Sequence, residues 1–390
     1  MRVAKILAIA VAALIVCTLG AVFWIGSNLE AWLNKVHPVA LPHVSAEART
    51  LHGSSFVVDM HADTLMLRSD LLANSKVGHV DLPRLQAGGV GLQFFTMPTR
   101  VPLRARIDHT DGNDFDALTL AGFAQRSELY GRGLLGRALL ASERLQSAIA
   151  RSDGLLLPVR SQADLATLRA RHAADARVVG GLLGIEGAHA LEDDVANLDV
   201  VFNAGFRMIG LTHFFDNAFA GSAHGIDKGG LTPLGRQLVQ AMEQRGVLVD
   251  VAHLSPRGID DVLAMATKPV VVSHGGVRGT CDNQRNLSDA HIRGIAKSGG
   301  VIGIGYWETA VCGTEMRYVT AAMRYVITLV GDDYVGLGSD FDGATTVGFD
   351  TAQLPALTQQ MINDGFSDST IRKILGENVL RVLSRTLPAT

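Results

Sequence analysis

Five side chains that could bind divalent metal ions follow apolar runs spread widely along the chain. They are His61, Asp63, Glu186, His253 and His274. Imidazole and carboxylate are ligands of catalytic Zn²⁺, and an open coordination position lets the ion lower the pKa of bound water to about 7. His61 and Asp63 stand two residues apart after a mostly apolar run, so one strand end could supply both. The sequence therefore predicts a hydrolytic metal site.

This group of ligands suits two ions that share one carboxylate. Two catalytic ions lie about 3.5–4 Å apart and can hold a bridging hydroxide between them. Glu186 is the only glutamate of the group, and no lysine falls at a strand end where a carboxylated lysine could bridge instead. A balanced division gives His61, Asp63 and Glu186 to one ion, and Glu186, His253 and His274 to the other. We therefore expect two Zn²⁺ ions per chain, bridged by Glu186.

Strands of a repeating βα pattern must position these residues. From about Phe56 onward, apolar runs of strand length alternate with segments of helical periodicity, such as Pro233–Arg245 and Pro256–Ala266. This alternation is typical of a parallel sheet. The long, charged stretch Arg100–Arg177 is expected to pack outside the sheet. Eight strands are expected, at Phe56–His61, Val90–Thr96, Val178–Glu186, Met208–His213, Val247–His253, Pro269–His274, Gly300–Tyr306 and Tyr334–Asp340.

Eight βα units predict a (β/α)8 TIM barrel with insertions. The main rival, a doubly wound open sheet, would have a glycine-rich loop after its first strand, but Met60 is followed by His-Ala-Asp-Thr. His213 and Asp340 join the five ligands at the carboxyl ends of the expected strands, where a barrel builds its active site. The ion assignment leaves these two residues free for catalysis. Six other histidines fall in expected loops or helices and are interpreted as structural: His52, His79, His109, His172, His224 and His291.

The charge of the chain argues against a nucleic-acid partner. It has 35 basic and 38 acidic residues, a formal net charge of −3 at pH 7, and no polycationic stretch. A nucleic-acid-binding protein needs a basic face for the phosphates. We therefore expect a small-molecule substrate.

An uncharged apolar segment, Ile6–Ile25, follows Arg2 and Lys5 at the amino end. At about 1.5 Å per helical residue, it would span the roughly 30 Å of bilayer hydrocarbon. We favour an uncleaved anchor over residues 1–26, with the catalytic body in the periplasm or outside the cell. The alternative is a cleaved signal peptide and a secreted form. Residues 27–50 are expected to form a short helix over Leu29–Val36 and a linker, and residues 51–390 the catalytic barrel domain.

Cys281 and Cys312 are the cysteines of the expected catalytic body. An oxidising compartment would allow them to form a disulfide, which we favour. The alternative is two separate buried thiols.

The candidate residues lie in motifs that resemble those of the membrane (renal-type) dipeptidases. The resemblance extends from about residue 55 to Leu383 and includes stretches without candidate ligands, such as His79–Gly88. The motifs are His61-Ala62-Asp63, Gly184–His189, Leu211–His213, Asp250–Ser255, Val272–His274, Arg285-Asn286 and Gly338–Gly343.

The resemblance implies a binuclear zinc (β/α)8 hydrolase that cleaves dipeptides and often accepts a D-residue at the carboxyl end. It implies the same five zinc ligands, with Glu186 as the bridge. It further implies that His213 contacts the substrate and that Arg285 receives the substrate carboxylate, and an arginine fork suits that role because it can make two parallel hydrogen bonds. The disulfide between Cys281 and Cys312 also matches the family, and the family precedent suggests a homodimer.

We expect the bridging hydroxide to attack the scissile carbonyl. His213 would stabilise the oxyanion, and Asp340 would carry the proton to the leaving amine. One alternative is a metal-dependent amidohydrolase of the same fold that acts on N-acyl-D-amino acids, lactones or β-lactams. Another is a catalytically inactive membrane-tethered binding protein, but such a protein would usually have lost a ligand, and none is missing here.

Overall fold

Eight parallel strands close into a barrel in the computed structural model, which describes residues 2–390. The ring closes where Leu337 pairs with Asp59 and where Leu92 pairs with Gly180. The expected (β/α)8 barrel is confirmed, and each of the eight expected strands overlaps one barrel strand. These strands are β2 (Val57–Ala62), β3 (Val90–Phe95), β5 (Val179–Ile185), β6 (Phe206–Gly210), β7 (Leu248–Asp250), β8 (Val271–Val272), β9 (Val301–Ile304) and β10 (Val335–Leu337).

The barrel strands are buried along their whole length, and most of their residues are apolar because both faces of each strand are covered. Successive residues point to opposite faces of a strand, and in β2 the alternate residues Val58 and Met60 belong to a different buried cluster from Val57. The short strand β4 (Leu156–Pro158), which the sequence analysis did not predict, pairs with the start of β5. It lies in the stretch Arg100–Arg177, whose helices pack outside the barrel as expected.

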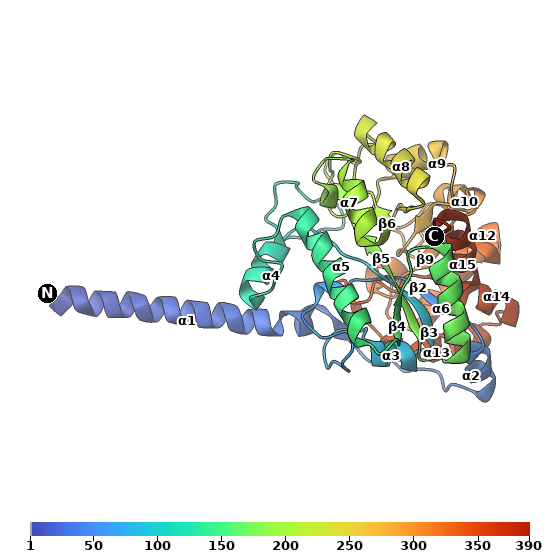
Figure 1. The fold of residues 1–390 in the computed structure, drawn as a ribbon, viewed down its shortest axis with the longest axis horizontal. Helices are drawn as coiled ribbons and strands as arrows, with labels where there is room; N and C mark the ends of the chain where they lie inside the picture. The colour runs from blue at the N-terminus through green and yellow to red at the C-terminus, as the bar shows by residue number, and fades with distance from the viewer. Residues whose placement is uncertain (1) are drawn as a thin grey trace.

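Helices surround the barrel (Figure 1). The expected helix Pro233–Arg245 is α8, which begins with a Thr232 side-chain cap on the Gly235 N–H and ends at Gly246 with a φ of 72°. The other helices of the body are α2 (Ala46–Gly53), α3 (Leu82–Ala87), α4 (Ala117–Gln125), α5 (Leu134–Arg151), α6 (Gln162–Ala174), α7 (Asn197–Ala204), α9 (Pro256–Met265), α10 (Asp289–Lys297), α11 (Glu308–Val311), α12 (Met316–Val330), α13 (Leu354–Asn363), α14 (Asp368–Arg372) and α15 (Asn378–Thr386).

The amino-terminal helix α1 (Arg2–Leu33) extends away from the body and is long and apolar enough to cross a membrane (Figure 1). The separate short helix expected over Leu29–Val36 is wrong, because α1 continues unbroken to Leu33. Ser27 and Asn28 do not interrupt it, since their side chains donate to the carbonyl oxygens four residues earlier. After α1, the strand β1 (Lys35–Val36) pairs in parallel with β11 (Thr346–Val347).

We predict that His52 makes the stability of the protein depend on pH. His52 is buried between α2 and α13, where its Nε2 donates to Gly88 O and its Nδ1 accepts from Thr358 Oγ1, both at 2.8 Å. Burial lowers the pKa of His52 below its ordinary value of 6.5. The unfolded chain therefore binds this proton more readily, and stability falls as the pH drops below about 6.5.

The measurement is urea unfolding of the full chain in detergent at pH 7.5 and pH 5.5. His52→Ala should cost roughly 2 kcal/mol at pH 7.5, because two buried hydrogen bonds are lost. The cost should be smaller at pH 5.5. His43→Gln, at an exposed position, is the control and should have no effect. An equal cost of His52→Ala at both pH values would contradict the prediction.

Candidate metal centre

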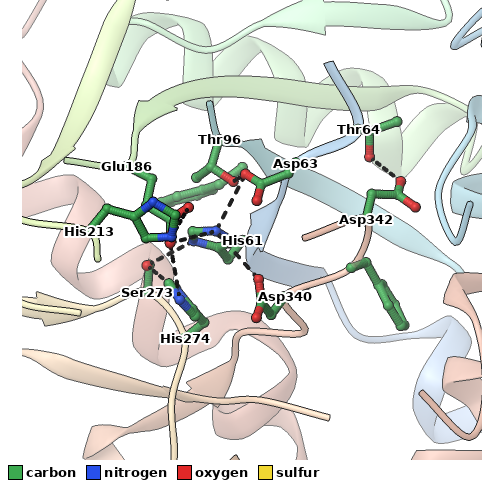
Figure 2. A network of polar contacts seen from close by, with 12 residues as sticks. His61, Asp63, Thr64, Thr96, Glu186, His213, Ser273, His274, Asp340 and Asp342 are labelled. Atoms are coloured by element: carbon green, nitrogen blue, oxygen red, sulfur yellow. Dashed lines mark hydrogen bonds and ion pairs between the residues drawn. The ribbon is translucent and has the colours of Figure 1, made fainter. Parts of the chain in front are cut away.

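Glu186, which directly follows β5, lies among histidines at the carboxyl ends of the barrel strands, and Figure 2 shows it beside His61, His213 and His274. Its Oε1 is 3.8, 3.0 and 3.3 Å from the Nε2 atoms of His61, His253 and His274. Asp63 Oδ1 lies 3.6 Å from His61 Nε2 and accepts from Thr96 Oγ1. All five predicted ligands are buried. The structure thus brings together residues that the sequence places far apart.

His213 and Asp340, which the sequence analysis left free for catalysis, border the same cluster. His213 Nε2 lies 3.4 Å from Glu186 Oε2, and Asp340 Oδ1 lies 3.8 Å from His61 Nε2. Among the described residues, three groups have ligand atoms close enough to share an ion, and two of them include His213 or Asp340. The three groups are His61, Glu186 and His274; Glu186, His213 and His253; and His61, Asp63 and Asp340.

Arg285 reaches the cluster from the loop after β8. Its side chain is buried, and one terminal N–H donates to His274 O at 3.0 Å. Its Nε has no partner among the described residues. The guanidinium group is therefore held at one end by His274 O, while its Nε–H remains available as a donor beside the metal-binding cluster.

The Ser273 hydroxyl orients two of the imidazoles. Ser273 Oγ donates to Asp250 Oδ2 at 2.6 Å, so its oxygen can accept from His61 Nδ1 at 3.0 Å and from His274 Nδ1 at 2.9 Å. Both rings then carry a proton on Nδ1 and direct Nε2 toward the cluster. Hydrogen bonds of this kind fix the tautomer of metal-binding histidines.

His224 orients the third imidazole, although the sequence analysis interpreted it as structural. Its Nδ1 donates to Ile107 O at 3.0 Å, which leaves its Nε2 to accept from His253 Nδ1 at 2.9 Å. His253 Nε2 is therefore also left with a free lone pair. No pattern in the sequence indicated this role, because His224 lies in a loop and not at the end of a strand.

The electrostatics of the cluster fit divalent cations. His253 and His274 have lowered pKa values, mainly through burial, so both rings are neutral and their Nε2 atoms face each other at 2.8 Å. Two facing lone pairs repel unless a positive charge lies beside them. His61 Nε2 is buried and has no hydrogen-bond partner among the described residues. A metal ion would satisfy all three nitrogen atoms.

The carboxylates of the cluster have too little positive charge around them. Burial raises the pKa of Glu186, and the charge of Asp63 raises it further. Burial likewise raises the pKa of Asp340 to about 8. Burial alone would lower the pKa of His61, but the carboxylates of Asp63, Glu186 and Asp340, all within 4 Å of its Nε2, raise it to about 10. Each of these shifts has the direction expected for an anionic pocket that suits metal cations.

The backbone at two of these positions is strained. His253 and Asp340 have φ values of 61° and 58°, in the left-handed region that residues other than glycine rarely adopt. Gly343 makes room for Asp340, because a side chain at this position would collide with the carboxylate.

A disulfide joins Cys281 to Cys312 and confirms the expected pairing. It ties the loop that carries Arg285 to the end of α11. Trp307, which directly precedes α11, also contributes to the wall of the site, because its ring lies 5.8 Å from the His274 ring.

Comparison with known proteins places this geometry in a family. The sequence model of the family Membrane dipeptidase (Peptidase family M19) matches residues 45–388. A relative in Klebsiella pneumoniae, an uncharacterized protein in the pqqA 5′ region, is 31% identical over 255 residues, which cover 61% of this chain and 92% of the relative.

Solved structures agree with this match. The dipeptidase AC, a metallo peptidase of family M19, superposes with a TM-score of 0.72 at 26% identity, covering 86% of this chain and all of that one. A metallo peptidase from Rhodobacter sphaeroides, solved with a phosphinate mimic of the dipeptide L-Ala-D-Ala, has a TM-score of 0.69 at 26% identity, covering 85% of this chain and all of that one.

We predict that Ser273→Ala weakens metal binding without unfolding the barrel. The substitution removes the acceptor that fixes the tautomers of His61 and His274, so the affinity for Zn²⁺ should fall about 10- to 100-fold. The measurement is competition with a chromophoric chelator, with circular dichroism to check the fold. Ser384→Ala, at an exposed position, is the control. Unchanged affinity in Ser273→Ala would show that its hydroxyl does not orient the ligands.

Proposed function

Because the chain belongs to the membrane dipeptidase family, peptidase family M19, we propose that it hydrolyses dipeptides with two Zn²⁺ ions bridged by Glu186. Family membership makes the protein a metal-dependent peptide hydrolase. The choice of zinc, the number of ions and the substrate stereochemistry are our proposal. The observation that carries it is the position of Glu186 Oε1, within 3.8 Å of three imidazole Nε2 atoms.

We assign His61, Asp63 and Glu186 to one ion, and Glu186, His253 and His274 to the other. Because the three imidazoles are held with their Nε2 atoms toward Glu186, they need little reorganisation to bind metal. When bound, the two ions would polarise the scissile carbonyl and lower the pKa of a water molecule. The mixed imidazole and carboxylate donors favour Zn²⁺ over Mg²⁺ or Ca²⁺, which prefer oxygen ligands.

Three further residues would act on the substrate. Arg285 would bind the terminal carboxylate with the part of its fork that His274 O leaves free. His213 would donate a hydrogen bond from Nε2 to the carbonyl oxygen, because its Nδ1 contact with Arg100 O is long, at 3.4 Å, and only weakly fixes the tautomer. Asp340 would accept the proton of the attacking water and transfer it to the leaving amine.

We propose that both L,L and L,D dipeptides are substrates. Support for a D-residue comes from the Rhodobacter sphaeroides structure, which contains a mimic of L-Ala-D-Ala. We also propose that α1 anchors the protein in a membrane, with the catalytic domain, residues 51–390, in the periplasm or outside the cell. The positive residues Arg2 and Lys5 before the apolar run support this orientation. A homodimer, suggested by the family, completes the proposal.

The proposal predicts two Zn²⁺ ions per chain and turnover of dipeptides. Metal content would be measured by mass spectrometry on the purified full chain, and activity on a panel of L,L and L,D dipeptides. Chelation should abolish activity, and Zn²⁺ should restore it. One ion per chain would disprove the binuclear assignment. Turnover of N-acyl-D-amino acids but not of dipeptides would favour the amidohydrolase alternative.

Arg285→Lys should raise KM about 10- to 100-fold with a smaller change in kcat. Lysine keeps the positive charge but cannot make two parallel hydrogen bonds to a carboxylate. The sharper measurement compares each dipeptide with its carboxyl-terminal amide. Amidation should strongly reduce turnover by the wild-type protein but only weakly reduce turnover by Arg285→Lys. Arg278→Lys, on the same loop, is the control, and an equal amide penalty in wild type and Arg285→Lys would rule out the proposed contact.

A further inference from the structure

Large apolar side chains are exposed in one part of the catalytic body. Outside α1, eight such side chains are exposed among the described residues, and six of them lie between Leu103 and Tyr130. We call these six the α4 patch because they lie on α4 and the segments that flank it. They are Leu103, Ile107, Phe115, Leu120, Phe123 and Tyr130.

Helix α4 packs against α1 at the end of the apolar span. The rings of Phe23 and Phe123 are 6.0 Å apart, and Gly26 lies so close to the Ala124 backbone that no side chain would fit on it. One helical turn further on, Glu30 Oε1 accepts from Gln125 Nε2 at 3.0 Å. Figure 1 shows α4 on the side of the body from which α1 emerges.

These contacts fix the depth of the patch relative to a bilayer. Phe23 lies two residues inside the uncharged run that ends at Ile25, or about 3 Å along the helix axis. Phe123 would therefore lie at the boundary between hydrocarbon and headgroups. Trp24 is 62% exposed next to this level, and tryptophan favours that layer. The Arg126 guanidinium stacks 3.9 Å from the Phe23 ring, where its charge can reach the headgroups.

The end of α1 also contacts loops at the catalytic end of the barrel. Glu30 Oε1 accepts from Arg68 N at 2.9 Å, in the loop after β2. Asn34 Oδ1 accepts from Ala344 N at 2.9 Å, four residues beyond Asp340. The carboxyl ends of β2 and β10 therefore lie on the same side of the body as the membrane helix.

The segment that carries the patch also borders the metal centre. Arg100 O contacts His213 Nδ1 at 3.4 Å, and Ile107 O accepts from His224 Nδ1 at 3.0 Å. Ile107 is itself 36% exposed as a member of the patch. One segment thus contacts His213 and His224 with its backbone and presents apolar side chains to the exterior.

We propose that the α4 patch rests in the interfacial layer of the bilayer that α1 crosses, so that the active-site end of the barrel faces the lipid surface. The exposed Arg104 and Arg106 lie between Leu103 and Ile107 in the sequence. The apolar side chains can therefore enter the interfacial layer while the guanidinium groups bind lipid phosphates. This inference rests on the proposed membrane anchor but not on the proposed chemistry.

The test measures membrane depth in the full chain reconstituted into phosphatidylcholine vesicles. A Cys17→Ser background carries one new cysteine, labelled with an environment-sensitive fluorophore, at Leu120 or at Ser384. Ser384 is exposed on α15, on the side of the body away from α1 (Figure 1). In a separate sample that keeps Cys17, which lies near the middle of the apolar run, a label on this cysteine reports insertion of α1 through quenching by lipids that carry the quencher on the acyl chain. Quenching by lipids that carry a quencher near the headgroup should be strong for Leu120→Cys and absent for Ser384→Cys.

Three other outcomes would each contradict one part of the inference. Quenching at Cys17 but not at Leu120→Cys would show an inserted anchor with the patch away from the lipid. Self-quenching at Leu120→Cys that rises with protein density, without lipid quenching, would identify a second copy as the occupant. Loss of quenching at Cys17 would remove the anchor itself. Dipeptide hydrolysis by the protein would be measured in the same vesicles. This measurement distinguishes each of these outcomes from failure of the proposed function.

Discussion

A buried cluster of negative charge is the constraint on which the catalytic end of the barrel depends. Asp63, Glu186 and Asp340 lie within 4 Å of His61 Nε2, and the charges of His61 and Arg285 only partly offset the rise in the pKa of Glu186. Burying unpaired carboxylates costs several kcal/mol per charge. Metal ions offset this cost, so metal binding and folding stability are thermodynamically linked in such a site. The surrounding structure can be understood as the framework that holds these charges together.

Close strand packing allows one serine to serve two histidines. Gly303 in β9 and Gly338 after β10 both lie against Ser273 O, and a side chain on either would collide with that oxygen. Ser273 can therefore sit deep in the barrel, with its N–H and hydroxyl both donating to Asp250. A larger residue at either glycine would push Ser273, and with it the orientation of His61, away from the centre. The tautomers of the histidine ligands therefore depend on the packing of the barrel strands.

The sequence was sufficient to predict the eight barrel strands and the clustering of the candidate ligands, because both follow from the chain locally. Each ligand ends an apolar run, and a parallel barrel gathers all such ends at one rim. The role of His224 could not be predicted, because it depends on how two loops meet, not on strand order. His79 is a similar case: its N–H and Nδ1 both bond to Asp342, whose φ of 64° shapes the turn beyond Asp340. The continuity of α1 could not be predicted, because Ser27 and Asn28 have low helix propensity but their side chains bond to carbonyl oxygens within the same helix.

The connection between α1 and the barrel is a packed element and not a free linker. Residues 35 and 36 form a strand with β11, and His37 and Val39 extend this contact by donating to Val347 O and Gly348 O. Asn34 and β11 therefore hold the turn that begins at Asp340 from two sides. A flexible tether would let the barrel take any orientation, since each free residue adds backbone entropy. Here the hydrogen bonds that hold the end of α1 against the body also hold the turn beyond Asp340, so the orientation of α1 and the geometry of this turn are coupled.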